Sequence, residues 1–221
     1  MRLAVTLADT PLSERQFDDL LEEAIAFHGH LCPGQVLGVR MAVAGCRQVG
    51  IDRPRRAGKG LVVFVEIDRC ACDAIQTVTG CSLGKRTLKH LDYGKMAATF
   101  VNVASGEAVR VVARDDARER AGAYAPGVTD PRKAQIAAYR VMPEAELLSL
   151  TPVVIRPGWL DRKRARVFCQ LCGEGINYGL EVVSDGLTLC RSCFAGGYYV
   201  PRTEGPAAPE EAIRSAHAAE A

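Results

Sequence analysis

Four cysteines in the C-terminal part of the sequence form two C-x₂-C pairs, Cys169 with Cys172 and Cys190 with Cys193, separated by seventeen residues. Each pair brings two thiolates to one side of a tight turn, and two pairs complete a tetrahedral site with sulfur–metal distances of about 2.3 Å. The spacing predicts a structural zinc site, with iron as the alternative metal for four sulfur ligands. Because such a site has no open coordination position, we expect it to have no catalytic role.

A second concentration of metal-ligating residue types lies in the N-terminal half of the chain. The segment His28 to Cys32 carries two imidazoles and a thiol, and Pro33 after it suits the first position of a helix, where free amides favour a thiolate. Three protein ligands and a water molecule would make a zinc site of the catalytic type. We therefore expect a second soft metal, zinc in the first instance, bound by residues from the set His28, His30, Cys32, Cys70, Cys72 and Cys81.

Catalytic roles in this N-terminal site would fall to a subset of its side chains. His30, Cys32 and Cys70 are the candidates at the metal, while Asp73 and Lys85 would move protons or bind an anion. Cys70 and Cys72 are separated by one residue, unlike the C-x-x-C of dithiol redox sites, so we rank metal binding above dithiol chemistry. The segment Gly80 to Lys85 is one residue short of a phosphate-binding loop.

These side chains need helices and a buried strand to position them. Ser13 and Gln16 predict a capping box that opens a helix through Phe27, and Pro33 predicts the start of a second helix that ends near Gly50. The run Leu61 to Ile67 predicts a strand buried on both faces. A short helix is expected over Asp73 to Thr79.

Further elements are expected in the rest of the N-terminal half. Strands are predicted over 97–103, 108–113 and 153–155, and helices after Asp130-Pro131 and Met142-Pro143. Because helices and strands mix without strict alternation, the expected fold is α+β, with a mixed β-sheet flanked by helices.

Length and composition indicate a globular chain with a small added module. The 221 residues, 23.8 kDa, are 48% hydrophobic and 24% charged, with a formal charge of only +2. We divide the chain into an α+β domain (1–155), a basic linker (156–168), a four-cysteine finger (169–200) and a flexible tail (201–221). The linker holds five basic residues and one acid, a local charge of 5 − 1 = +4.

Cysteine usage and hydropathy indicate the compartment. The sequence has nine cysteines, an odd number that excludes a fully paired disulfide framework. No apolar run reaches the roughly 18 residues of a membrane helix, and the N-terminus lacks the features of a signal peptide. We expect a cytoplasmic protein in a reducing compartment, with no membrane partner. Cys46 is expected to be a small buried hydrophobic residue, and His90 and His217 to be surface residues.

Three blocks of the sequence resemble the FmdE family, which takes its name from a component of formylmethanofuran dehydrogenase: FHGHLCPGQVLGVRMA (27–42), CACDAIQTVTGCSLGK (70–85) and DYGKMAATF (92–100). The resemblance implies a distantly thioredoxin-like α+β domain with a metal-binding pocket. By position it assigns to the site His28, His30, Cys32, Cys70, Asp73, Gln76, Cys81, Lys85, Tyr93, Gly94 and Lys95. Cys72 stands where an aliphatic residue is usual, which leaves open whether Cys70 or Cys72 faces the site, and Ser82 replaces a usual threonine.

The resemblance also extends to the finger and to a functional setting. The four-cysteine segment is similar to the treble-clef zinc finger of longer family members and to the DksA/TraR-type finger. The family implies an accessory or metal-dependent protein linked to molybdenum or tungsten enzymes, with such an oxidoreductase as a candidate partner. Fold-level analogy does not supply a reaction, and the sequence does not distinguish a component of a complex from a free-standing protein.

Two other functions compete with this interpretation. The finger and the basic linker are also found in nucleic-acid-binding or transcription-associated proteins, but one finger seldom gives specific DNA recognition. We rank nucleic-acid binding second because it gives the N-terminal cysteines and histidines no role. In a third interpretation, the finger is a docking platform for a protein partner or for a second copy of the chain in a homodimer.

Overall fold

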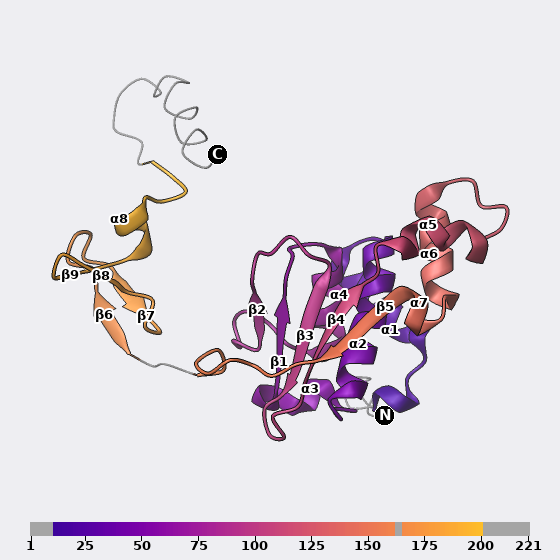
Figure 1. Cartoon of the computed structure of the whole chain (residues 1–221), viewed down its shortest axis with the longest axis horizontal. Helices are drawn as coiled ribbons and strands as arrows, with labels where there is room; N and C mark the ends of the chain where they lie inside the picture. The colour runs from indigo at the N-terminus through magenta and orange to yellow at the C-terminus, as the bar shows by residue number, and fades with distance from the viewer. Residues whose placement is uncertain (1–10, 162–164, 201–221) are drawn as a thin grey trace, which may run out of the picture. The chain divides into compact units, whose positions relative to one another are not determined.

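The computed structural model describes residues 11–161 and 165–200, and the chain divides into two compact units, Met1–Arg156 and Pro157–Ala221 (Figure 1). Predictions for the tail 201–221, including His217, and for residues 162–164 of the basic segment lie outside the described residues. No helix in the described part of the chain is both long and apolar enough to cross a membrane.

The N-terminal unit contains a five-stranded sheet in the order β2-β1-β3-β4-β5 (Figure 1). Its strands are β1 (Leu61–Val65), β2 (Leu88–His90), β3 (Ala97–Asn102), β4 (Ala108–Ala113) and β5 (Leu148–Pro152). Strands β1 and β2 are parallel and the other pairs are antiparallel, so that Val63 lies between Leu88 and Phe100. This confirms the predicted α+β fold with a mixed sheet, and the order β2-β1-β3-β4 is that of the thioredoxin-like sheet implied by the resemblance.

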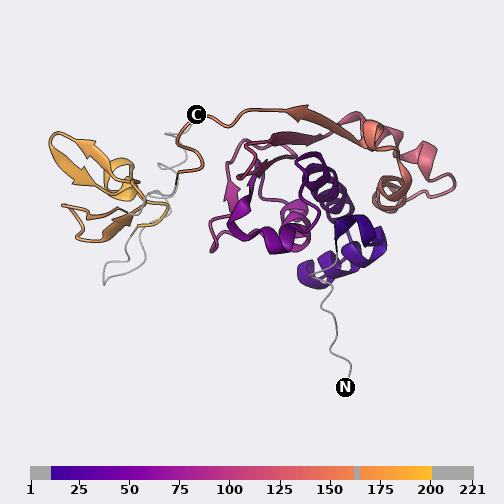
Figure 2. The ribbon, with the colours of Figure 1, turned by 90° about the horizontal axis from the view of Figure 1, so that it is seen from below.

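Three helices cover one face of this sheet: α1 (Phe17–His28), α2 (Pro33–Gln48) and α4 (Cys70–Thr79) (Figure 2). Helix α2 contacts β3 and β4, and the core between them includes Val36, Met41, Val63, Phe100 and Val111, all 1% exposed or less. The remaining helices are α3 (Pro54–Ala57), α5 (Asp116–Tyr124), α6 (Pro131–Val141) and α7 (Glu144–Leu147), and single 3₁₀ turns lie at Leu12–Glu14 and Gly58–Gly60. Helix α6 begins as predicted, with the Asp130 carboxylate accepting from the Lys133 amide.

Some element boundaries differ from the predictions. The predicted capping box at Ser13 is wrong, because Ser13 donates its amide and its hydroxyl to the Asp52 carboxylate and α1 begins at Phe17. The last strand covers 148–152 rather than 153–155, because Leu148-Ser-Leu-Thr alternates apolar and polar residues and pairs with β4. Helix α4 begins at Cys70, three residues earlier than expected.

The C-terminal unit is built from two short hairpins and one helix. Strand β6 (Arg166–Phe168) pairs with β7 (Gly175–Asn177), β8 (Val182–Ser184) pairs with β9 (Leu187–Leu189), and α8 covers Arg191–Ala195. Strand β6 therefore occupies the last residues of the segment predicted as a linker. Asp185 and Gly186, at φ 51° and 78°, form the tight turn between β8 and β9 that this dipeptide favours.

Close contact between α2 and α4 depends on glycine. A Cβ atom on Gly38 would lie 2.5 Å from the Ala71 carbonyl oxygen and 2.8 Å from the Ala71 Cα, and one on Gly34 would lie 2.8 Å from the Cys70 Cβ. Backbone atoms of a packed helix cannot move aside cheaply, so any larger residue would force the two helices apart. The two glycines therefore set the spacing between the first turns of α2 and α4.

A Gly38→Ala substitution should lower the free energy of unfolding by about 1–3 kcal/mol, because the added methyl group overlaps the α4 backbone. Gly122→Ala is the matched control, since Gly122 lies in α5 and a methyl group added there would have no neighbouring atom within 4 Å. This control should be neutral or gain up to about 1 kcal/mol. Urea unfolding of both variants tests the prediction, and equal stabilities would contradict it.

Candidate metal centres

Three predicted ligands of the N-terminal unit converge at helix ends. His28 is the last residue of α1, Cys32 is the N-cap of α2 and Cys70 is the first residue of α4. The His28 Nε2 lies 3.9 Å from the Cys32 Sγ, and one ligand atom from each of the three residues lies within 4.8 Å of the others. Two thiols and one imidazole are a soft ligand set that suits zinc and leaves a fourth tetrahedral position for water or substrate.

Local sequence explains why these three helix ends meet. Gly29 ends α1 in the left-handed conformation, at φ 92°, and Pro33 starts α2 four residues later. The short turn between them places Cys32 beside the end of α1. Because Gly34 and Gly38 admit α4 at close range, the same turn also lies beside Cys70.

The imidazole of His28 is oriented by a carboxylate. Its Nδ1 lies 2.7 Å from the Asp73 Oδ2, one turn into α4. If Nδ1 carries the proton and donates to Asp73, the lone pair of Nε2 faces the thiols. A carboxylate behind a histidine ligand fixes its tautomer and ring orientation and raises its basicity in known metal sites.

Burial keeps at least one of the two thiols protonated while no metal is bound. Burial raises the pKa of Cys70, and a hydrogen bond with Cys32 raises it further. Cys32 is only 2% exposed. Metal binding at this site would therefore release protons, since thiolates are the ligands.

Gln35 is a polar residue at this site that sequence reasoning did not assign. It is fully buried in the first turn of α2, and its Nε2 donates to the Cys70 carbonyl at 2.6 Å. Its Oε1 has no hydrogen-bond partner among the described residues. A lone amide beside the apolar residues Val36 and Leu37 was the available signal. Gln35 thus links the two helix ends that carry the candidate thiol ligands.

A Gln35→Met substitution should weaken N-terminal metal binding about 10- to 100-fold, the usual effect of removing a group that orients a ligand. Stability should change by less than about 1 kcal/mol, because the lost hydrogen bond is offset by removing a buried acceptor that has no partner among the described residues. Competition with a chromophoric chelator measures the affinity.

Thr79→Val is the matched control for Gln35→Met. Thr79 is also a buried polar residue bonded to an α4 carbonyl, with its hydroxyl donating to Ile75 at 2.6 Å. Because it lies at the far end of α4, we expect its metal affinity to match the wild type. Equal affinities of Gln35→Met and Thr79→Val would contradict the role given to Gln35.

The other predicted site residues lie outside this three-residue group. Cys72 donates its thiol to the Ile67 carbonyl at 2.7 Å, and the buried Cys81 lies 3.7 Å from the Leu61 carbonyl. The exposed His30 stacks at 4.6 Å, centroid to centroid, on His28. Lys85 donates to the Gly80 carbonyl at 3.1 Å. Of the two cysteines left open by the sequence, Cys70 is therefore the one beside Cys32 and His28.

Two further cysteines of the N-terminal unit lie outside both groups of converging ligands found in the described chain. Burial raises the pKa of Cys81, and burial together with the nearby Cys81 raises that of Cys46. Cys46 is fully buried in the core between α2 and the sheet. Its surroundings are those of a small apolar residue, as expected.

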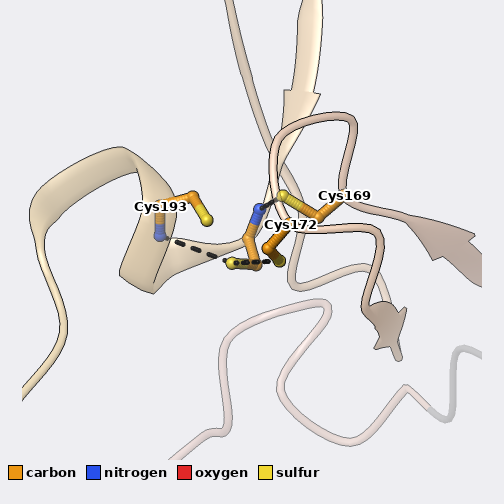
Figure 3. A group of neighbouring side chains, drawn as sticks. Cys169, Cys172 and Cys193 are labelled. Carbon is orange, nitrogen blue, oxygen red and sulfur yellow. Dashed lines mark hydrogen bonds between the residues drawn. The ribbon is translucent and has the colours of Figure 1, made fainter. Parts of the chain in front are cut away.

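The four cysteines of the C-terminal unit form the second candidate centre (Figure 3). Cys169 and Cys172 flank the turn after β6, where Gly173 has φ 76°, and Cys190 and Cys193 lie at the start of α8. Their sulfur atoms lie within 4.8 Å of one another, with 3.9 Å between Cys172 and Cys190. A cysteine turn, a hairpin and a helix start that supply four thiols fit a zinc finger of the treble-clef kind.

Backbone amides prepare this centre for thiolate ligands. The amides of Cys172 and Cys190 lower the pKa of Cys169 to about 6. The Cys190 amide donates to the Cys169 sulfur at 3.3 Å, and the Cys193 amide donates to the Cys190 sulfur at 3.4 Å. Such bonds stabilise the charged form of sulfur that a metal requires.

Comparisons with known proteins agree with this geometry. The chain is 42% identical over 94 residues to a "Probable S-adenosyl-L-methionine-binding protein" of Archaeoglobus fulgidus, but these residues are 42% of this chain and only 26% of that protein. The crystal structure of an FmdE-like protein of tungsten formylmethanofuran dehydrogenase from Syntrophus aciditrophicus shares the fold. That match has a TM-score of 0.59 and 23% identity, and covers 87% of this chain and 99% of the other.

A family model gives the assignment. Residues 27–149 match the model described as FmdE, molybdenum formylmethanofuran dehydrogenase operon. The matched segment runs from the residue before His28 to the strand β5, and so includes all three converging ligands and the whole sheet except its last residues. The chain therefore belongs to the FmdE family.

Proposed function

We propose that this protein binds a soft divalent metal, zinc in the first instance, through His28, Cys32 and Cys70, and acts there as a metal-dependent enzyme or accessory protein. The observation that carries the proposal is the convergence of an imidazole and two thiols within 4.8 Å, with Asp73 bonded to the far nitrogen of the imidazole. Three protein ligands leave a position for an exchangeable fourth ligand. A structural zinc in the C-terminal unit completes the proposal.

The chain's own residues would divide the work at this centre. The thiolates of Cys32 and Cys70 would neutralise a divalent cation, and Asp73 would hold the proton on the Nδ1 of His28. A bound metal would supply Lewis acidity toward the fourth ligand. His30, stacked on His28 and exposed, and Lys85 on the loop after α4 remain candidates for moving protons or for binding an anion.

Cobalt titration tests the ligand set directly. Co²⁺ added to the metal-free chain should give thiolate-to-cobalt absorption of two kinds, from a site with four sulfurs and from a site with two sulfurs and a nitrogen. Cys32→Ala should remove only the second kind. A single four-sulfur spectrum in the wild type would contradict the N-terminal centre.

The link to molybdenum or tungsten enzymes rests on the family description alone. Within that proposal the protein would deliver metal or sulfur to such an oxidoreductase, which would then be its partner. Deleting the gene in its host and assaying the molybdenum- and tungsten-dependent oxidoreductases tests this. Unchanged activities and unchanged metal content of those enzymes would refute the link.

Nucleic-acid binding stays the second candidate. The described C-terminal unit from residue 165 to 200 contains two basic residues, Arg166 and Arg191, against three acids, Glu174, Glu181 and Asp185. With four thiolates on a divalent cation the finger would carry more negative charge still, which disfavours phosphate contacts. Salt-dependent binding of nucleic acid at low ionic strength would favour this alternative. The predicted homodimer and cytoplasmic location remain predictions, and light scattering would test the first.

A further inference from the structure

A pocket of about 200 Å³ lies beside the N-terminal metal centre, between α4 and the ends of two strands. Strands β1 and β2 are parallel and α4 connects them, so their carboxyl ends and the start of α4 meet at one edge of the sheet. Val65 and His90, the last residues of the two strands, both line the pocket. In open sheets with helical crossovers, this edge is where ligands bind.

The pocket shares a residue with the metal centre. Asp73 lines it, and the same carboxylate bonds to the Nδ1 of His28. A molecule in the pocket would thus lie one side chain away from a candidate metal ligand. Gln76, one turn further along α4, lines the pocket as well.

The lining defines the chemical class of the occupant. The aliphatic side chains of Val65, Ile67, Leu83 and Leu88 form an apolar wall, and Leu83 is 64% exposed at its rim. Asp68 and Asp73 contribute two carboxylates, and no lysine or arginine is among the described residues that line it. The carboxylates raise the local density of negative charge, as does neighbouring Cys72 if ionised. An apolar group that is neutral or positively charged fits this lining, and an anion does not.

We infer that this pocket binds the apolar part of a neutral or cationic small-molecule substrate or ligand of the metal centre, with Asp68 selecting against anions. The inference rests on the proposed function for its chemical role, but not for the binding itself. The first turn of α4 carries partial positive charge, but Asp73 in that turn already offsets it. The selecting charges are therefore the two carboxylates.

Three probes of nearly equal size test the inference: choline as the cation, 3,3-dimethylbutan-1-ol as its neutral isostere and 3,3-dimethylbutanoate as the anion. Amide chemical shifts of the full-length, metal-loaded chain are followed during each titration. Choline and the alcohol should give saturable shifts at Val65, Asp68 and Gln76. The anion should bind at least about tenfold more weakly.

Two variants and a control separate binding from charge selection. Leu83→Glu, at the exposed rim, should abolish binding of the alcohol, and Val141→Glu, equally exposed on α6, should leave it unchanged. Asp68→Lys should shift the ratio of choline to anion affinity toward the anion by about tenfold or more. No saturable shift with any probe, or an unchanged ratio in Asp68→Lys, would overturn the inference.

The same samples distinguish this failure from a failure of the proposed function. Metal content is measured on each before the titration. A chain that binds choline but has no N-terminal metal would support the pocket and refute the metal centre. A chain with two metals that binds none of the probes would refute the pocket alone.

Discussion

Replacing Cys169 with serine should unfold the C-terminal unit and leave the N-terminal unit folded. Among the described residues of the C-terminal unit only Cys169 and Ile176 are buried, so these hairpins have almost no apolar core. Segments of this size need a metal, disulfides or a partner to fold. A structural zinc supplies about 10–16 kcal/mol of binding free energy, which becomes folding free energy when the apo segment is unfolded.

Limited proteolysis and amide chemical shifts of the full chain would measure this effect. Resonances from residues 165–200 should collapse to unfolded positions in Cys169→Ser, and a strong chelator should do the same to the wild type. Ser184→Ala, in the hairpin but without a ligand role, is the control and should keep native shifts. A folded, protease-resistant C-terminal unit in Cys169→Ser would show that the fold does not depend on the four-thiol centre.

Exchanging Cys70 and Cys72 separately for alanine should have opposite consequences for the N-terminal metal. Cys70→Ala removes one of three converging ligands, and we expect affinity to fall by at least about 100-fold, more than the loss of an orienting group causes. Cys72→Ala removes a thiol that donates to the Ile67 carbonyl, so affinity should stay within about threefold of the wild type. Competition with a chromophoric chelator measures both.

This pair controls for general effects of losing a cysteine. The two residues lie two positions apart on α4, and both are partly buried. Circular dichroism should show both variants folded, since Cys72→Ala costs at most one weak hydrogen bond and a small volume. Loss of metal from Cys72→Ala, or from both variants equally, would mean that Cys70 is not the ligand.

The main elements of the fold could be predicted from local patterns. The buried strand β1 is a continuous run of apolar and β-branched residues, and the start of α2 is indicated by Pro33. Strand β2 has only three residues and was not predicted, because its pairing with β1 is a tertiary contact that no local pattern specifies. The capping box at Ser13 failed for a related reason, since Asp52, thirty-nine residues away, takes both of its hydrogen bonds.

The candidate site could be predicted as a set of residues but not as a geometry. Spacing placed six cysteines and histidines near two helix starts, and could not tell that only His28, Cys32 and Cys70 bring their ligand atoms together. That selection depends on the rotation of α4 about its axis, which the contacts of Gly34 and Gly38 fix. The role of Gln35 depends on a bond between residues thirty-five positions apart, which a single sequence does not show.

The central claim is that a metal is held by His28, Cys32 and Cys70 in addition to the metal of the four-cysteine centre. Elemental analysis of the full chain, purified without chelator or added metal, tests it most directly when wild type, Cys32→Ala and Cys46→Ala are compared. We predict two metal ions per chain in the wild type and in Cys46→Ala, whose cysteine is a core residue, and one in Cys32→Ala. One metal ion per chain in all three proteins would contradict the claim.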